Sequence, residues 1–256
     1  DEFICVIGEG VDDTRERVLA IGNSKIRVID SKWNEKMRDR GFVYGQQKMI
    51  AQFNCSGDWA FYLEGDEVLH ELEVSNIREE MQKNLEDLEV EALYFDFFHF
   101  YGSPNQVGVA GYRRAPRIIR NTIRSIAPDG LFWTVMDKNK KGRYPKAKYA
   151  GANIYHYGHC RSVSKMAEKM KQVGRYWGSR HEDFRGYGSI DVRELRPFGG
   201  SHPAVMEEWL ASEAETEFCQ DPEYRVTRRD LRNRFRFWIE DIFGVEISKK
   251  HYRRLD

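Results

Sequence analysis

Acidic side chains follow a short apolar run in residues 57–69, and they could hold a metal ion. Residues 59–63 predict a buried strand, and Glu64 and Asp66 come directly after it. Residues two apart in an extended segment point to the same side, so both carboxylates could reach one ligand. Such hard oxygen ligands suit Mg²⁺ or Mn²⁺, which can neutralise the charge of a diphosphate. The alternative is a solvated acidic turn.

Histidines farther along the chain are candidates to complete this site. His156 follows the apolar run 152–155, and a neutral imidazole is a good ligand for Mn²⁺. His159, three residues later, could replace it, and a histidine satisfied within the core is the competing interpretation. His99 lies in an aromatic run, where the pattern favours a structural role.

Arg117 and Arg120 are candidates to bind a diphosphate or an acidic acceptor. They lie three residues apart, directly after Pro116. Guanidinium groups bind phosphate and carboxylate oxygens with two parallel hydrogen bonds. Simple pairing with surface acids is the alternative.

The elements that must position these groups alternate between strand and helix. We predict strands at 3–7, 25–29 and 59–63, with helices ending near Ala20 and spanning 44–55. This alternation indicates a parallel sheet with right-handed crossovers. Ligands of such sheets bind at the carboxyl ends of the strands. Because these folds usually begin with a strand and helix before the one at residue 3, we expect the first such unit to be missing.

The rest of the chain changes from strands to helices. A charged helix is expected at 71–88 and a long aromatic strand at 91–101. Further strands are expected at 116–119, 131–135 and 147–157, and further helices at 164–177, 203–218 and 227–243. We find no repeat and no low-complexity linker. The pattern predicts one α/β domain over residues 1–200 and a helical extension over 201–256 packed on it.

Composition excludes several classes of protein. The 256 residues carry 41 Lys+Arg and 41 Asp+Glu, so no global field favours nucleic acid. The aromatic content of 13% is too high for a disordered chain. No apolar run approaches the ~18–20 residues that span a bilayer, and the start shows no signal-peptide pattern. The four cysteines lack CxxC spacing, which favours reduced thiols in a cytoplasmic protein.

Residues 57–69, GDWAFYLEGDEVL, resemble the GDW and D-x-D segment of family 2 glycosyltransferases with the GT-A fold. Glu64 stands where the family usually has Asp. The loop after the first strand, with Gly8, Glu9 and Asp12, resembles the family's acidic loop for the base and ribose, although the aspartate that normally closes that strand is absent. Gln47 lies where the family has a polar residue facing the donor.

Four further segments resemble a bacterial subgroup of these enzymes. They are HFYGS at 99–103, RIIRN at 117–121, IYHYG at 154–158 and GSHP at 200–203. The resemblance implies a mixed, mostly parallel sheet flanked by helices and a metal-dependent transfer of sugar from a nucleotide-diphosphate donor to a saccharide or lipid-linked acceptor, as in polysaccharide biosynthesis. It implies metal ligation by Asp66, Glu64 and His156, and donor binding by Gly8, Glu9, Asp12, Gln47, Glu64, Arg117 and Arg120.

An inverting transfer also needs a base, because a carboxylate must take the proton of the attacking hydroxyl. Asp129, in a Pro-Asp-Gly sequence, is our first candidate and Asp137 the second. Asp96 lies in the middle of a predicted strand. An ordinary turn is the alternative role for Asp129.

The predicted helix at 227–243 interleaves arginines with Phe235, Phe237 and Trp238, and Thr227 can cap it. One interpretation is docking onto an anionic bilayer beside a lipid-linked acceptor. The other is a helix that packs its aromatic residues on the domain and leaves its arginines in water.

Two rival functions use the same pattern. A sugar-phosphate nucleotidyltransferase would also combine a parallel sheet with an acidic metal site, although no Gly-rich loop with Lys or Arg is evident near residue 1. A saccharide- or partner-binding module without turnover is the other, and the Glu64 substitution is compatible with it.

Overall fold

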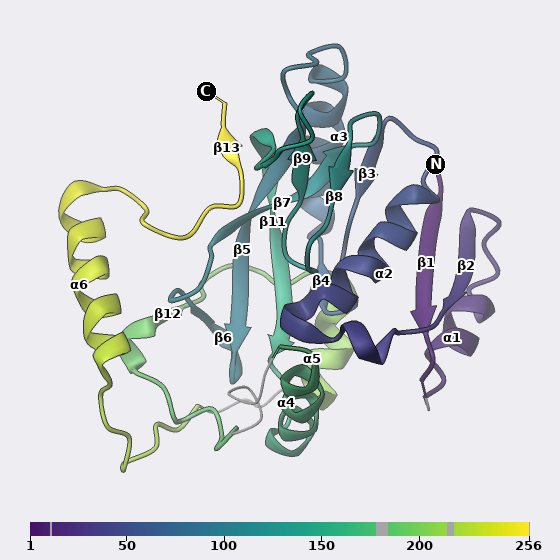
Figure 1. Ribbon diagram of the computed structural model, residues 1–256. Coiled ribbons are helices and arrows are strands. Elements are labelled where there is room, and N and C mark those ends of the chain that lie inside the picture. Colours follow the sequence, from purple (N-terminus) through teal and green to yellow (C-terminus); the bar gives the residue numbers. More distant parts are fainter. Residues whose placement is uncertain (11, 178–183, 214–217, 256) are drawn as a thin grey trace.

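Two long strands form the centre of the computed structural model, which describes residues 1–10, 12–177, 184–213 and 218–255 (Figure 1). Strand β5 (Ala92–Tyr101) pairs in parallel with β11 (Lys146–His159), and His99 lies opposite His156. Their carboxyl ends therefore meet at one edge of the sheet, the lower edge in Figure 1.

Six further strands complete the central sheet. They are β3 (Trp59–Phe61), β4 (Glu67–Val68), β6 (Ser103–Gly108), β7 (Arg114–Arg120), β12 (Leu195–Pro197) and β13 (Arg253–Arg254). The pairings make β3, β5, β11, β12 and β13 run one way and β4, β6 and β7 the other. The expected mixed α/β architecture, with a sheet flanked by helices, is confirmed.

The first two predicted strands form a sheet of their own. Strand β1 (Phe3–Gly8) pairs in parallel with β2 (Ile26–Ser31), as predicted, through the crossover helix α1 (Thr14–Ala20). The third predicted strand is shorter than expected. As β3 it joins the central sheet, where it pairs antiparallel with β7.

Short strands form a third sheet, and helices surround the sheets. The third sheet contains β8 (Ser125–Ile126), β9 (Thr134–Met136) and β10 (Gly142–Arg143). The other α-helices are α2 (Phe42–Phe53), α3 (Val74–Lys83), α4 (Val163–Trp177), α5 (Glu207–Glu213) and α6 (Arg228–Phe243). Short 3-10 turns lie at Glu35–Met37, Asp39–Gly41, Glu71–Glu73, Val192–Glu194 and Ala204–Met206. The helix predicted at 203–218 forms only over α5, and residues 214–217 lie outside the described part.

Both faces of the central sheet are buried. Along β5, Leu93 and Phe95 pack on one face with Ile77 of α3. Tyr94 points to the other face and packs with Trp133. This alternation is the two-residue period of a strand, so neighbouring residues enter separate core clusters.

The C-terminal segment does more than pack as a helical extension. Its strand β13 pairs in parallel with the start of β11, Lys146 lying opposite Arg253. Helix α6 lies far to the left of β1 in Figure 1. Within the described residues, none of the helices has the length and apolar character that crossing a membrane requires.

Candidate functional site

The acidic loop after β3 is tied directly to the centre of the sheet. Strand β4 pairs antiparallel with β11, which places Glu67 opposite His156. The N–H of Tyr157 donates to the carbonyl of Asp66, at 2.9 Å, and the N–H of Glu67 donates to the carbonyl of Glu64, at 3.0 Å. The loop is therefore a closed turn, and Asp66 comes next to His156 because β4 docks on β11.

A buried ion pair between Glu67 and Arg117 holds the acidic loop in place. Both oxygens of Glu67 accept hydrogen bonds from Arg117, at 2.6 Å from Nη2 and 2.9 Å from Nε. Both side chains are buried, and Glu67 Oε2 also accepts from the N–H of Glu64, at 3.2 Å. Burial alone would lower the pKa of Arg117, but Glu67 reverses this and raises it well above its ordinary value. Glu67 and Arg117 thus position the loop.

Asp66 meets a cation and an imidazole on its two oxygens. Lys169 of α4 donates to Oδ2, at 2.7 Å, and also to the carbonyl of Gly158, at 2.9 Å. His156 Nε2 lies 3.6 Å from Oδ1. Burial would raise the pKa of Asp66, but His156 and Lys169 outweigh burial and hold the pKa well below its usual range. The carboxylate is therefore ionised.

A chain of hydrogen bonds decides which nitrogen of His156 faces Asp66. The carbonyl of Tyr112 can only accept, so His99 Nε2, 2.9 Å away, carries a proton. Burial lowers the pKa of His99 well below its ordinary value, so the ring is neutral and its Nδ1 accepts. His156 Nδ1, 2.9 Å from it, must then be the donor. Burial also lowers the pKa of His156, against the opposing effect of Asp66. The other nitrogen of His156, Nε2, faces the carboxylate of Asp66.

These two groups fit a divalent cation. Asp66 Oδ1 and His156 Nε2, 3.6 Å apart, are atoms that would hold a divalent cation, which would supply positive charge at this position. A Cβ at Gly158 would lie 2.4 Å from His156 Nε2 and 2.9 Å from Asp66 Oδ2, so glycine keeps this space open. The donor set, a carboxylate and an imidazole nitrogen, suits Mn²⁺.

The expected third ligand lies elsewhere. Glu64 Oε1 faces Arg117 Nη2 at 3.7 Å, and no group of three His, Cys, Asp or Glu side chains within the described ranges is arranged around one metal position. The turn explains the difference, because Glu64 and Asp66 are not in an extended segment. Burial raises the pKa of Glu64 to about 7, although 37% of its side chain remains exposed.

The cationic side chains whose charges act on the Asp66 carboxylate include Lys169 and Arg161. The sequence pattern indicates Arg117 and Arg120 instead. Arg161 Nε is buried and makes no hydrogen bond with a described residue. An unpaired buried donor is costly, so this atom could bind a phosphate oxygen beside the cation position.

The predicted diphosphate clamp is wrong in its residues. The guanidinium of Arg120 donates to four backbone carbonyls, those of Asn84, Leu85, Asp87 and Val90. In the sheet, Arg120 lies opposite Trp59, the first residue of β3, whereas the acidic loop follows Phe61, the last residue of that strand. Arg117 is fully buried against Glu67. Two residues three apart on a strand point to opposite faces, so they could not act together.

An aromatic cluster lies beside the predicted nucleoside loop. We define the aromatic cluster as Trp33, Tyr44 and Tyr176, whose ring centroids lie 5.0–5.5 Å apart. Trp33 packs on the end of β1, where a Cβ at Gly8 would lie 2.4 Å from its indole nitrogen. Burial and then the charges of Tyr176 and Glu64 raise the pKa of Tyr44 to about 12. The cluster therefore joins the end of β1 to α2, which carries Tyr44, and to α4, which carries Tyr176.

Three polar residues predicted to bind the donor, Gln47, Glu9 and Asp12, differ in the contacts that they make. The Oε1 atom of Gln47 is buried and accepts no hydrogen bond from the described residues, so a ligand donor could satisfy it. Glu9 is exposed and pairs with Lys32 at 3.1 Å. Asp12 is exposed and accepts from the N–H of Thr14 at 3.2 Å.

Both candidate bases stabilise turns. Asp129 Oδ1 accepts from the backbone N–H groups of Leu131 and Phe132, at 2.8 and 3.3 Å. Asp137 Oδ1 accepts from the N–H groups of Asn139 and Lys141, at 2.7 and 2.8 Å. These are the local bonds that make aspartate common in turns. Asp137 begins the turn between β9 and β10, in a sheet separate from the acidic loop.

Sequence reasoning missed several residues of the site. Glu67 is part of the acidic run, but its residue type alone predicts no role for it. The structural role favoured for His99 agrees with its place in β5, while its hydrogen bond to His156 is visible only in the structure. Lys169 lies on a charged amphipathic helix, where no local pattern distinguishes it from its neighbours. Gly158 could have been found, because glycine in a long strand often marks close approach to a ligand.

Comparison with known proteins adds no family to this description. No protein-family model matches the chain, and a search of curated proteins finds none similar to it.

Proposed function

We propose that the protein transfers a sugar from a nucleoside-diphosphate donor and that it is a glycosyltransferase of the GT-A type. The observation that carries the proposal is the pair Asp66–His156, in which a carboxylate oxygen and an imidazole nitrogen face each other at 3.6 Å. A divalent cation held there supplies positive charge for a departing diphosphate. The pair lies at the carboxyl edge of the parallel strands β5 and β11, where α/β sheets bind ligands.

The chain's own residues divide the remaining work. Lys169, which contacts Asp66, and Arg161, whose charge acts on the same carboxylate, are the donors for phosphate oxygens. Their fixed positive charge stabilises the negative charge that develops on the leaving group. The aromatic cluster offers ring faces on which a nucleobase can stack, and Gln47 Oε1 offers an acceptor.

Donor turnover tests the proposal. The full chain is incubated with Mn²⁺ and each of a panel of uridine, guanosine, cytidine, thymidine and adenosine diphosphate sugars, and release of the nucleoside diphosphate is measured. We expect turnover with one donor class and a loss of at least about 100-fold in Asp66→Asn and in His156→Ala, because each change removes one ligand of the cation. Asp87→Asn, which removes a surface partner of Lys148, is the matched control.

Two outcomes contradict the proposal. One is donor turnover that is equal in the wild type, Asp66→Asn and His156→Ala. The other is pyrophosphate release from a nucleoside triphosphate and a sugar phosphate, without donor turnover, which would indicate a nucleotidyltransferase.

A further inference from the structure

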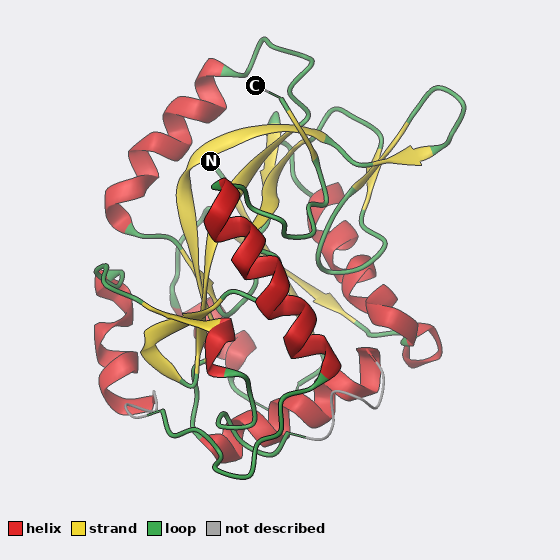
Figure 2. Cartoon of the chain, turned by 90° about the vertical axis from the view of Figure 1, so that its left-hand side faces the viewer, coloured by secondary structure: helices red, strands yellow, loops and turns green. Residues whose placement is uncertain are grey.

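Helix α6 turns an apolar stripe outward. We define the α6 stripe as Leu231, Phe235, Trp238 and Ile242, which follow one another at intervals of four, three and four residues and so lie on one helix face. Each is between 53% and 61% exposed. Figure 2, which faces α6, shows the helix in front of the molecule with no other element over it. A soluble helix normally turns such a stripe inward.

The opposite face of α6 holds the helix to the domain through polar contacts and through Phe237, which is buried. Arg234 donates to both oxygens of Asp191, at 2.6 and 3.0 Å. Asn233 donates to Glu194, and Arg236 donates to the carbonyl of Ala110, at 2.9 Å. Packing on the domain therefore buries Phe237 but leaves the α6 stripe exposed.

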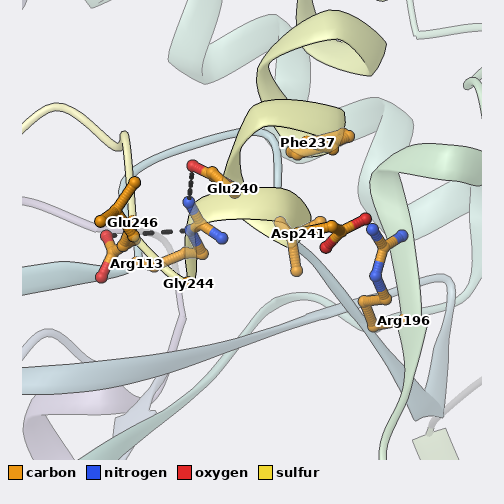
Figure 3. Close-up of a pocket in the computed structure, with 9 residues that line it drawn as sticks. Arg113, Arg196, Phe237, Glu240, Asp241, Gly244 and Glu246 are labelled. Carbon is orange, nitrogen blue, oxygen red and sulfur yellow. Dashed lines mark hydrogen bonds and ion pairs between the residues drawn. The ribbon is translucent and has the colours of Figure 1, made fainter.

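Specific contacts also fix the C-terminal half of α6. Glu240 and Glu246 flank Arg113, at 2.5 and 3.8 Å (Figure 3). They line a cavity of about 310 Å³ beside the helix. In the same view Asp241 and Arg196 point toward one another. The helix is thus anchored on its inner face along its length, and its outward orientation is built into the fold.

The charges around the α6 stripe select the partner. Arg228, Arg229 and Arg232 are exposed, and Asp241 is the one exposed acid among the residues of α6. Two copies of this face would bring together surfaces of the same net charge, which is unfavourable. An anionic lipid surface instead attracts arginine and accepts aromatic and aliphatic side chains below its headgroups.

Further apolar side chains near the end of α6 are exposed. They are Phe243, the last residue of the helix, and Val245 and Ile247, which follow Gly244. Large exposed apolar patches mark interaction sites.

We propose that α6 docks the protein on an anionic membrane surface, with the α6 stripe in the boundary between headgroups and acyl chains. The arginines then contact lipid phosphates while their aliphatic stems cover apolar surface. This inference is independent of the proposed transferase activity, because none of its residues contacts the Asp66–His156 pair.

Vesicle sedimentation tests the docking. The full chain is spun with neutral phosphatidylcholine vesicles and with vesicles containing about 30% phosphatidylglycerol. We expect binding at least about tenfold stronger to the anionic vesicles, and weakening by about fivefold for each of Arg228, Arg229 and Arg232 that is replaced by Gln. The double variant Phe235→Ser/Trp238→Ser should lose about 100-fold or more, because two buried aromatic anchors are removed.

The control removes two apolar side chains that are exposed elsewhere, each to 75%, which is more than Phe235 or Trp238. Leu72→Ser/Leu88→Ser should bind anionic vesicles as the wild type does, because neither leucine lies on α6. Circular dichroism and thermal unfolding of both double variants check that each is folded.

The proposal is overturned if binding does not differ between neutral and anionic vesicles, or if Phe235→Ser/Trp238→Ser binds as tightly as the wild type. It is also overturned if light scattering shows a dimer that this double variant abolishes while the wild type fails to sediment with vesicles. A second copy of the chain would then cover the α6 stripe.

Discussion

The Nδ1 atoms of His99 and His156 lie 2.9 Å apart, and His99 is the acceptor of the pair. This follows because the carbonyl of Tyr112 accepts a hydrogen bond from Nε2, the other nitrogen of His99. A histidine in the core strand β5 thereby determines which atom of His156 faces Asp66. Metal-binding histidines commonly depend on such a partner for ring orientation and tautomer.

Replacing His99 should therefore weaken cation binding without removing a ligand. In His99→Phe the ring volume is kept but the acceptor for His156 is lost, and we expect the affinity for Mn²⁺ to fall by about 10- to 100-fold. The measurement is a titration of free Mn²⁺ followed by electron paramagnetic resonance. His202→Phe is the control, because His202 bonds to Tyr157, the next residue along β11 and therefore on its other face. Unchanged affinity in His99→Phe would show that His99 has no positioning role.

Gly158 should be essential to the same cation position. In Gly158→Ala the new methyl group would lie 2.4 Å from His156 Nε2, so the ring must move or the space must close. We expect Mn²⁺ affinity to fall more than tenfold while circular dichroism remains that of the wild type. Gly111→Ala is a matched control, because a Cβ there meets no atom within 4 Å. If both variants bind Mn²⁺ equally, the cation does not occupy this space.

Breaking the pair Glu67–Arg117 should destabilise the fold. In Glu67→Gln a buried guanidinium loses its charged partner, and we expect the free energy of unfolding to fall by about 3–5 kcal/mol. Urea unfolding followed by fluorescence measures this. Glu79→Gln, on the exposed face of α3, should change stability by no more than about 0.5 kcal/mol. Similar small losses in both variants would mean that Arg117 finds other partners.

The contact between Asp191 and Arg234, which holds α6 to the domain, should stabilise the fold less at acid pH. The hydrogen bond with Arg234 is the main cause that holds the pKa of Asp191 below its ordinary value. Its stabilising contribution is therefore complete above the ordinary pKa of about 3.9 and is lost as the pH falls through the lower, folded value. We expect Asp191→Asn to be about 1–3 kcal/mol less stable than the wild type at pH 7, and this difference to shrink below pH 4.

The free energy of unfolding of Asp191→Asn and of the wild type is measured between pH 3 and pH 7. Asp13→Asn is the control, because the pKa of Asp13 is also lowered, by Arg17, but both side chains are exposed. We expect no resolvable stability change there. A difference between Asp191→Asn and the wild type that is constant over the whole pH range would contradict the assignment.

Local sequence signals predicted most of the long elements. Strands β1, β5 and β11 and helices α2, α4 and α6 form where apolar periodicity places them, because that periodicity reflects which face each element must bury. The N-cap of α6 is confirmed as well, since Thr227 Oγ1 accepts from the N–H of Asp230. Strands β4 and β13, of two residues each, carry no such signal and form only because β11 pairs with them.

The candidate site likewise has residues that the sequence identifies and contacts that only the tertiary structure decides. The sequence alone identified the acidic loop and His156, because acids after an apolar strand and a histidine in a strand are visible as residue types. Only the tertiary structure decided that Asp66 meets Lys169, which is 103 residues away, and that Glu67 rather than Glu64 binds Arg117 closely. Which side chains meet depends on how β4 docks on β11, and sequence spacing contains no information on that contact.

For α6 the sequence alone established an amphipathic helix with arginines and aromatic residues. It did not establish which face the helix turns toward the domain. Asp191, Glu194 and Arg113 lie far from α6 in the sequence, and their charges select the polar face of the helix as the inner one. Burial of Phe237 and polar contacts with distant segments together set the orientation, and the α6 stripe is left exposed to solvent.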